Sequence, residues 1–293
     1  MRELVRRHPL ATFFVLANLL SWLAWTPWLI SNNGLGLWDF EFPAGQLLGV
    51  LPGAYLGPIF SAFLVTALAD GRAGLRRWVG RLFRWKVSWK WYAISLLAVP
   101  AVLILTGFLT SGGSLRAPAL AVLIAYIPGL VLQMLTTGLA EEPGWRDFAL
   151  PRLQRRFGAW RSALILGPLW ALWHLPLFFS DWGGYPDAHW SRPVSFIVFC
   201  IAFNVAMAYV FNRTGQSLPM AMLLHVSVNN FMSIVWSDMF PTLGDDVSSV
   251  ALAVAAVVVA IVLLVVTRGR LGYVPEADEG AERTAPPAGP GVR

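Results

Sequence analysis

The chain has 293 residues, of which 57% are hydrophobic, only 13% are charged and 15 are tryptophan. Because soluble domains carry about a quarter charged residues, this composition excludes a soluble protein and predicts an integral, multi-pass membrane protein. The formal net charge of +6 does not predict a nucleic-acid partner, since the basic residues lie in short loops between apolar runs.

Eight apolar runs are long enough to cross a bilayer as helices, which predicts an all-α polytopic fold. They lie at 10–31, 45–69, 89–110, 118–142, 160–180, 194–212, 216–237 and 247–267. The first run lacks a small-residue cleavage site, so we expect a retained helix and not a removed signal peptide.

The loops predict the orientation of these spans. All but two of the 22 basic residues fall on one side, and the exceptions are Arg116 and Arg192. The positive-inside rule therefore predicts that this side and both termini are cytoplasmic. We expect residues 1–272 to form a single transmembrane domain. Residues 273–293, rich in Pro, Ala, Gly and Glu, are expected to form a disordered cytoplasmic tail.

The segment from Arg76 to Lys90 allows two interpretations. It could form an amphipathic helix on the inner leaflet, with Trp78, Leu82, Phe83 and Trp85 facing lipid. It could equally be a short basic loop that serves only to fix the topology.

Two adjacent carboxylates, Glu141 and Glu142, follow a long run without charged side chains and precede Arg146. Charges within a membrane span are costly and indicate a functional site. If the segment is helical, Glu142 and Arg146 share one face and can pair, while Glu141 points about 100° away.

Pro143 leaves two possibilities for this span. The helix could end at Pro143-Gly144, with the acids capping its cytoplasmic end. Alternatively, a kinked helix could continue to about Leu150, which would place Glu141 roughly 15 Å into the membrane. We predict the kinked continuation, with a buried Glu142–Arg146 pair.

His174 lies in one later span, and His225 and Asn229 lie in another, four residues apart and so on one face. Each of them alone would indicate an interhelical contact. Together with Glu141 they form a set that could activate water or bind a divalent metal. Three further polar residues are expected to make packing contacts: Gln133, Asn204 and Asn212.

The segments EEPGWR, WALWH and HVSVN resemble, in this order, the three motifs of the CPBP family. This family contains type II CAAX prenyl proteases (CAAX prenyl protease 2-like) and bacteriocin-processing, Abi-like membrane proteases. Its motifs are Glu-Glu-x-x-x-Arg, Phe-x-x-x-His and His-x-x-x-Asn. The resemblance places a protease core at about 118–237. Trp170 replaces the phenylalanine of the second motif, which we expect to reshape the pocket and leave the chemistry intact.

The resemblance implies roles for four residues around the scissile bond. Glu141 would activate the hydrolytic water with the help of His174. His225 and Asn229 would stabilise the oxyanion of the tetrahedral intermediate.

The resemblance also implies that Glu142 and Arg146 orient this site and balance its charge. In one form of the mechanism, Glu141, His174 and His225 hold a zinc ion or another divalent metal, which keeps an open position for water. The other form has no metal, and Glu141 then acts as base and acid in turn.

The leading hypothesis is an intramembrane metalloendopeptidase-like hydrolase with a cavity open toward the cytoplasmic side. It would cleave a membrane-associated peptide or protein near the surface of the lipid bilayer. A transporter that binds ions or protons at the same cluster is an alternative. A non-proteolytic scaffold or immunity-type protein that binds a peptide is another. The sequence indicates neither the substrate, prenylated or not, nor the oligomeric state.

Overall fold

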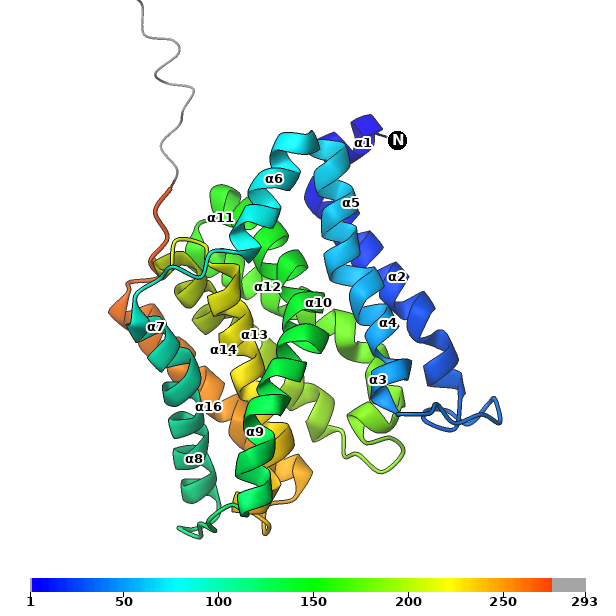
Figure 1. Cartoon of the computed structure of the whole chain (residues 1–293), viewed down its shortest axis with the longest axis vertical. Coiled ribbons are helices and arrows are strands. Elements are labelled where there is room, and N and C mark those ends of the chain that lie inside the picture. The colour runs from blue at the N-terminus through cyan, green and yellow to red at the C-terminus, as the bar shows by residue number, and fades with distance from the viewer. Residues whose placement is uncertain (1, 276–293) are drawn as a thin grey trace, which may run out of the picture.

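The computed structural model describes residues 2–275, and within them eight helices have the length and composition to cross a membrane. The eight predicted spans and the all-α fold are thereby confirmed, and the described residues contain no strand (Figure 1). The spans are Pro9–Ile30, Gln46–Ala69, Trp89–Thr110, Leu120–Phe157, Ala159–Phe179, Ser191–Arg213, Leu218–Met239 and Asp245–Val266.

Several spans consist of α-helical pieces joined by wider π-helical turns. The first half of the chain contains α1 (Arg2–Arg7), α2 (Pro9–Ile30), α3 (Gln46–Gly49), α4 (Leu51–Ala54), η1 (Tyr55–Ile59), α5 (Phe60–Ala69), α6 (Gly71–Leu82), α7 (Trp89–Ala93), η2 (Ile94–Ala98) and α8 (Val99–Thr110). The second half contains α9 (Leu120–Gln133), η3 (Met134–Gly138), α10 (Leu139–Glu142), η4 (Pro143–Ala149), α11 (Leu150–Phe157), α12 (Ala159–His174), η5 (Leu175–Phe179), η6 (Asp181–Gly183), α13 (Ser191–Arg213), α14 (Leu218–Asn230), η7 (Phe231–Trp236), α15 (Ser237–Met239) and α16 (Asp245–Val266).

Both ends of the described chain lie at the same end of the bundle, together with α6 and α11 (Figure 1). This is the end that carries the basic loops, and we call it the basic end. Its cytoplasmic placement stays a prediction. Of the predicted tail, residues 276–293 lie outside the described part, whereas Tyr273 packs half-buried against the core.

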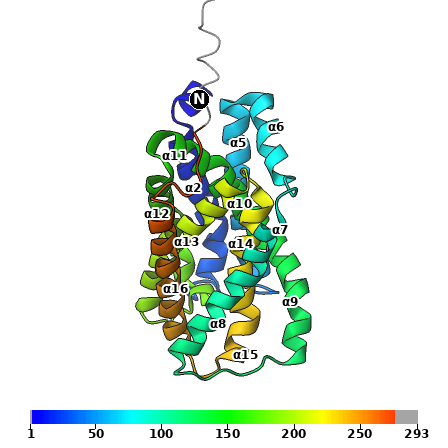
Figure 2. The same cartoon turned by 90° about the vertical axis from the view of Figure 1, so that its left-hand side faces the viewer.

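The core lies between α2, α12, α13 and α14. Helices α12, α13 and α16 pack side by side (Figure 2), and most of α14 is buried. Large aromatic side chains fill the space between these helices because they bury much apolar area in few residues. Five tryptophans are fully or almost fully buried there: Trp25, Trp28, Trp145, Trp170 and Trp173.

The fourth span is one continuous helix of 38 residues. It runs through Pro143 and past Leu150, as predicted, so the alternative in which it ends at Pro143-Gly144 is wrong. Proline lacks an N–H and clashes with the carbonyl one turn earlier, and the π-helical turn η4, which begins at Pro143, accommodates it. Gly144 is needed here because a Cβ would approach the Pro58 carbonyl oxygen to 2.7 Å.

The basic segment between the second and third spans is helical, but α6 begins at Gly71 and ends at Leu82, earlier than the predicted helix. The interpretation of an amphipathic helix with Trp78 facing lipid is wrong at this residue, because its side chain is buried and its indole N–H donates to the Pro143 carbonyl over 3.0 Å. Phe83 and Trp85, by contrast, are exposed.

Candidate active site

The predicted ion pair between Glu142 and Arg146 is present and completely buried. Oε2 of Glu142 lies 3.0 Å from Nε of Arg146, and both side chains are 0% exposed. Arg146 also donates to the side-chain carbonyl of Asn204 on α13, and the Asn204 amide donates to the Cys200 carbonyl over 2.7 Å. Asn204 was expected to be a packing contact, whereas the structure makes it a partner of the buried arginine.

The second carboxylate oxygen of Glu142 connects the fourth span to the seventh. Nδ1 of His225 lies 2.7 Å from Oε1 of Glu142. Because a carboxylate accepts, the Nδ1 of His225 donates, and its Nε2 is directed away from Glu142. A buried carboxylate held from two sides in this way is far less costly than an unpaired one.

Glu141 points away from this pair, as the helical spacing predicts, and faces Trp170 on α12. Its Oε2 accepts a hydrogen bond of 2.8 Å from the indole N–H of Trp170. The same oxygen lies 3.9 Å from Nε2 of His174. A phenylalanine at position 170 would have no N–H to donate, so the replacement adds a contact to Glu141 that the sequence analysis missed.

His174 is fixed by its backbone and by aromatic rings. Its Nδ1 lies 2.9 Å from the Trp170 carbonyl, and since a carbonyl only accepts, Nδ1 carries the hydrogen and Nε2 faces Glu141. Its ring stacks on Trp182 with centroids 5.7 Å apart and meets the edges of Trp173 and Phe196. These contacts leave the imidazole little freedom to turn.

His225 and Asn229 lie one turn apart on α14 and face the same cavity. Nδ2 of Asn229 is 3.4 Å from Nε2 of His225. His225 is 3% exposed, and its ring meets the Trp170 ring edge-on, with centroids 5.2 Å apart. The structure thus brings together all six predicted site residues, which come from three spans; their catalytic roles stay predictions.

A cavity of about 510 Å³ joins these groups. The lining includes Glu141, His174, His225 and Asn229, and continues to Gln46 in α3, Trp182 in η6 and Ser249 near the start of α16. These last three residues lie toward the end of the bundle opposite the basic end. If the basic end is cytoplasmic, as predicted, the cavity does not open toward the cytoplasmic side, because Trp145, Phe148 and Leu150 fill the core on that side of Glu141.

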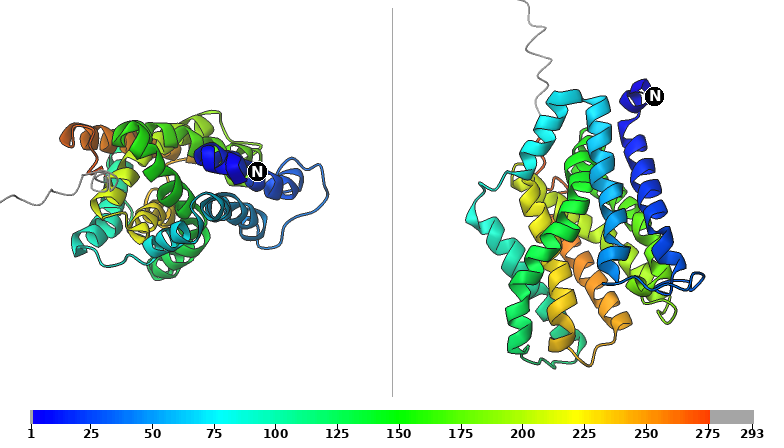
Figure 3. Two further views of the ribbon diagram at one scale, coloured as in Figure 1. Left: turned by 90° about the horizontal axis from the view of Figure 1, so that it is seen from above. Right: turned by 45° about the vertical axis from the view of Figure 1, so that its right-hand side comes forward.

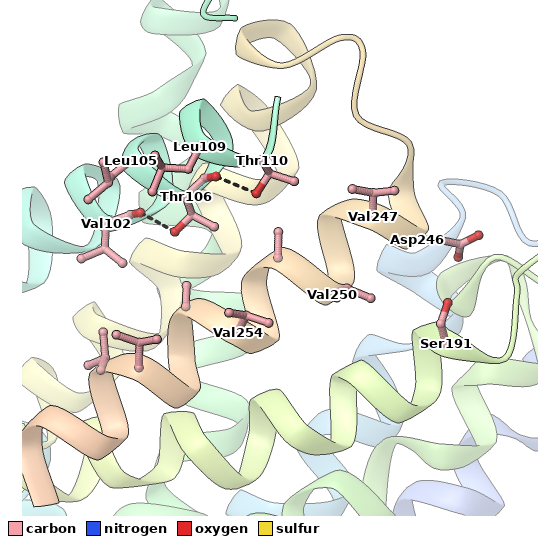
Figure 4. Close-up of a pocket in the computed structure, with 14 residues that line it drawn as sticks. Val102, Leu105, Thr106, Leu109, Thr110, Ser191, Asp246, Val247, Val250 and Val254 are labelled. Atoms are coloured by element: carbon pink, nitrogen blue, oxygen red, sulfur yellow. Dashed lines mark hydrogen bonds between the residues drawn. The ribbon is translucent and has the colours of Figure 1, made fainter. Parts of the chain in front are cut away.

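A larger groove, of about 710 Å³, lies between α8 and α16 (Figure 4). Its walls are mostly valine, leucine and alanine, and the hydroxyls of Thr106 and Thr110 donate back to carbonyls of their own helix. Ser191 and Asp246 also line it, and Asp246 is paired with Arg192. No histidine lines it. This groove therefore lacks the groups that hydrolytic chemistry needs.

The predicted metal ligands do not have the donor geometry that a metal requires. Among residues 2–275, no group of three His, Cys, Asp or Glu side chains is placed to hold a metal ion. Oε2 of Glu141 and Nε2 of His174 are 3.9 Å apart, and Nε2 of His225 is covered by the Asn229 amide. In this arrangement the three donors do not fit a zinc site, and ligation by Glu141, His174 and His225 stays a prediction.

Asp147 and Arg81 form a further ion pair beside the site that the sequence analysis missed. Asp147 directly follows Arg146, is completely buried, and pairs with Arg81 on α6. The available signal was a third acidic side chain within the same span as Glu141 and Glu142.

Comparisons with known proteins agree with this site. Residues 123–231 match the model of the family described as type II CAAX prenyl endopeptidase Rce1-like, and this range contains all three motifs. The chain is also similar to the CAAX prenyl protease 2 of Methanococcus maripaludis, with 24% identity over 194 residues that cover 62% of this chain and 70% of that protein. The chain is thus similar to membrane proteases of the CPBP type, and these similarities, together with the eight spans, support an intramembrane endopeptidase.

Proposed function

We propose that the enzyme hydrolyses a peptide bond with a water molecule held between Glu141 and His174. The distance of 3.9 Å between Oε2 of Glu141 and Nε2 of His174 is too long for a direct hydrogen bond, but one water can bond to both atoms. This gap, at the wall of a 510 Å³ cavity, is the observation that carries the proposal.

In the proposed reaction Glu141 is the base and then the acid. It takes a proton from the water while the water oxygen attacks the carbonyl carbon of the substrate. It then returns that proton to the leaving amine as the C–N bond breaks. Trp170 holds Oε2 in position through its 2.8 Å hydrogen bond, and the lone pair on Nε2 of His174 orients the water.

His225 and Asn229 are proposed to stabilise the oxyanion of the tetrahedral intermediate. In its imidazolium form His225 would donate from Nε2, and Glu142, 2.7 Å from its Nδ1, would balance that charge. Arg146, paired with Glu142, brings the buried cluster of two carboxylates and two cations to zero net charge. A positioned donor of this kind contributes roughly 10²- to 10³-fold in kcat.

The proposed substrate is a membrane-associated peptide or protein that reaches the site from the bilayer. Leu47 on α3 and Leu132 on α9 both line the cavity, and they are 45% and 54% exposed on the surface of the bundle. The cavity therefore reaches the lipid-facing surface between α3 and α9. Because a relative is a CAAX prenyl protease, a prenylated CAAX peptide is one member of this substrate class to test.

The test is cleavage of a library of membrane-associated peptides by the purified protein, with and without a prenyl group. Glu141→Ala and His174→Ala should each lower kcat by roughly 10²-fold or more. His189→Ala, which removes an exposed histidine in a loop, should leave turnover unchanged. Wild-type turnover in both site variants would refute the proposed mechanism. Binding without cleavage would favour a scaffold, and substrate flux without cleavage would favour a transporter.

A further inference from the structure

Helix α6 is bonded directly to the turn that holds the acid pair. The indole of Trp78 donates to the Pro143 carbonyl over 3.0 Å, and Arg81 pairs with the buried Asp147. Both acceptors belong to η4, which begins immediately after Glu142 and contains Arg146. The position of α6 is therefore coupled to the position of the buried ion pair.

A hollow of about 610 Å³ lies between α6, the turn at residues 212–216 and the end of the described chain. Arg77, Arg81 and Arg84 line it from the α6 side. A smaller hollow of about 140 Å³ adjoins it, and Arg77 and Arg81 line both. Arginine guanidinium groups gathered around one space are a typical binding site for phosphate or carboxylate groups.

The acidic residues of the two hollows are already engaged. Asp147 pairs with Arg81 and Asp70 pairs with Arg152. Arg84 donates only to the Gly215 carbonyl, and no hydrogen bond or ion pair joins Arg77 to another described residue. Within the described chain, the guanidinium groups of Arg77 and Arg84 thus form no ion pair, although Arg84 lies near enough to Asp147 for electrostatic attraction.

The position of this hollow identifies the anion. Helix α6, cyan in the right-hand view of Figure 3, lies at the basic end of the bundle. Next to it Phe83, Trp85 and Trp89 are 69%, 46% and 72% exposed. Exposed aromatic side chains next to basic ones are typical of the headgroup layer of a membrane. An anion held at this level by Arg77 and Arg84 would be a phospholipid phosphate.

We propose that the hollow between α6 and the 212–216 turn binds the headgroup of an anionic phospholipid, and that the bound lipid holds α6 against η4. The lipid phosphate pairs with Arg77 and Arg84. Lipid binding then stabilises the contacts of Trp78 and Arg81 with η4, and so keeps Glu142 and Arg146 in position.

Binding is tested on the full chain in nanodiscs of phosphatidylcholine, by native mass spectrometry with added phosphatidylglycerol. Arg77→Gln/Arg84→Gln should weaken phosphatidylglycerol binding on the order of tenfold or more. The control Arg72→Gln/Arg76→Gln removes the same charge from the exposed face of α6, outside both hollows, and should change binding less than threefold. Equal loss in both variants would show unspecific surface attraction and overturn the proposal. Competition by millimolar inorganic phosphate would identify a free-anion site instead and equally overturn it.

The coupling to η4 has a separate readout. Phosphatidylglycerol should raise the unfolding temperature and the peptidase rate of the wild type and of the control, but not those of Arg77→Gln/Arg84→Gln. Arg77→Lys/Arg84→Lys keeps both charges and should recover part of the lipid response that the glutamine variant loses. This recovery would show that substitution at these two positions does not itself disrupt the fold. Lost lipid binding with an unchanged response to phosphatidylglycerol would refute the coupling. Lipid binding and unfolding do not depend on the proposed catalytic mechanism. If only the peptidase assay fails, the result therefore counts against that mechanism and not against the lipid site.

Discussion

The indole N–H of Trp170 donates a 2.8 Å hydrogen bond to Oε2 of Glu141, the oxygen that also faces His174. In the family motif this position is phenylalanine, which has no hydrogen-bond donor. The chain therefore holds its proposed base by a contact that the motif itself does not provide. The carbonyl of Trp170 accepts from Nδ1 of His174, so one residue positions both groups around the proposed water.

Replacing Trp170 by phenylalanine should lower kcat by roughly 10- to 100-fold, because a hydrogen bond to a charged group contributes about 1.5–3 kcal/mol. The KM should change little, since the aromatic wall of the cavity is retained. The matched control is Trp236→Phe, which removes a buried indole hydrogen bond to Ser248, outside the cavity that Glu141 lines. Equal losses in both variants would show that the effect is structural.

Neutralising the buried acid of the ion pair should destabilise the fold. Glu142→Gln leaves Arg146 unbalanced at 0% exposure and should lower the free energy of unfolding by about 3–5 kcal/mol. The double variant Glu142→Gln/Arg146→Met should lose less than the sum of the single variants. The measurement is unfolding in mixed micelles with increasing denaturing detergent.

The chain offers a control with the same chemistry and spacing. Glu3 and Arg7 also form a pair four residues apart, but their side chains are 67% and 71% exposed. Glu3→Gln should change the free energy of unfolding by less than about 0.5 kcal/mol. A similar effect at both sites would contradict the importance of burial at Glu142.

Metal analysis separates the two forms of the mechanism. With the donors arranged as described, we expect purified wild type to keep its peptidase activity after dialysis against a chelator. Zinc bound at one equivalent in wild type, and lost in both His174→Ala and His225→Ala, would instead support the three-ligand site and refute the metal-free form.

The direction of the cavity can be measured with cysteine labelling. The chain has a single cysteine, Cys200, which is buried. Replacing it in a Cys200→Ala variant gives a cysteine-free chain into which single cysteines can be introduced for labelling. In intact cells an impermeant maleimide should label Gln46→Cys, near the mouth of the cavity, but label Arg72→Cys only after permeabilisation. The reverse pattern would invert the predicted orientation, and a peptide inhibitor that protects Gln46→Cys would place the substrate path there.

The extents of the spans could be predicted because apolar length is a local property, and the third span, Trp89–Thr110, has the predicted bounds. The continuation through Pro143 followed from matching the depth of Glu141 to that of His174 and His225. These predictions needed only helix geometry and the cost of charges in lipid.

Features that depend on packing between distant segments could not be predicted. The burial of Trp78 arises from its hydrogen bond to Pro143, 65 residues away, while its sequence neighbours predict an interfacial residue. The partner of Asp147 is Arg81, on a helix outside the core motifs. The direction of the cavity depends on which side of Glu141 the large side chains fill, and Trp145 and Phe148 fill the basic side.

The 38 unbroken residues of the fourth span would measure about 57 Å end to end, whereas the hydrocarbon layer of a bilayer is about 30 Å thick. Such a helix must tilt or project beyond the acyl chains, and the amount depends on membrane thickness. The height of Glu141 above the bilayer midplane would then change with acyl-chain length. The position of the scissile bond along a membrane-anchored peptide should therefore shift between vesicles made from short-chain and long-chain lipids.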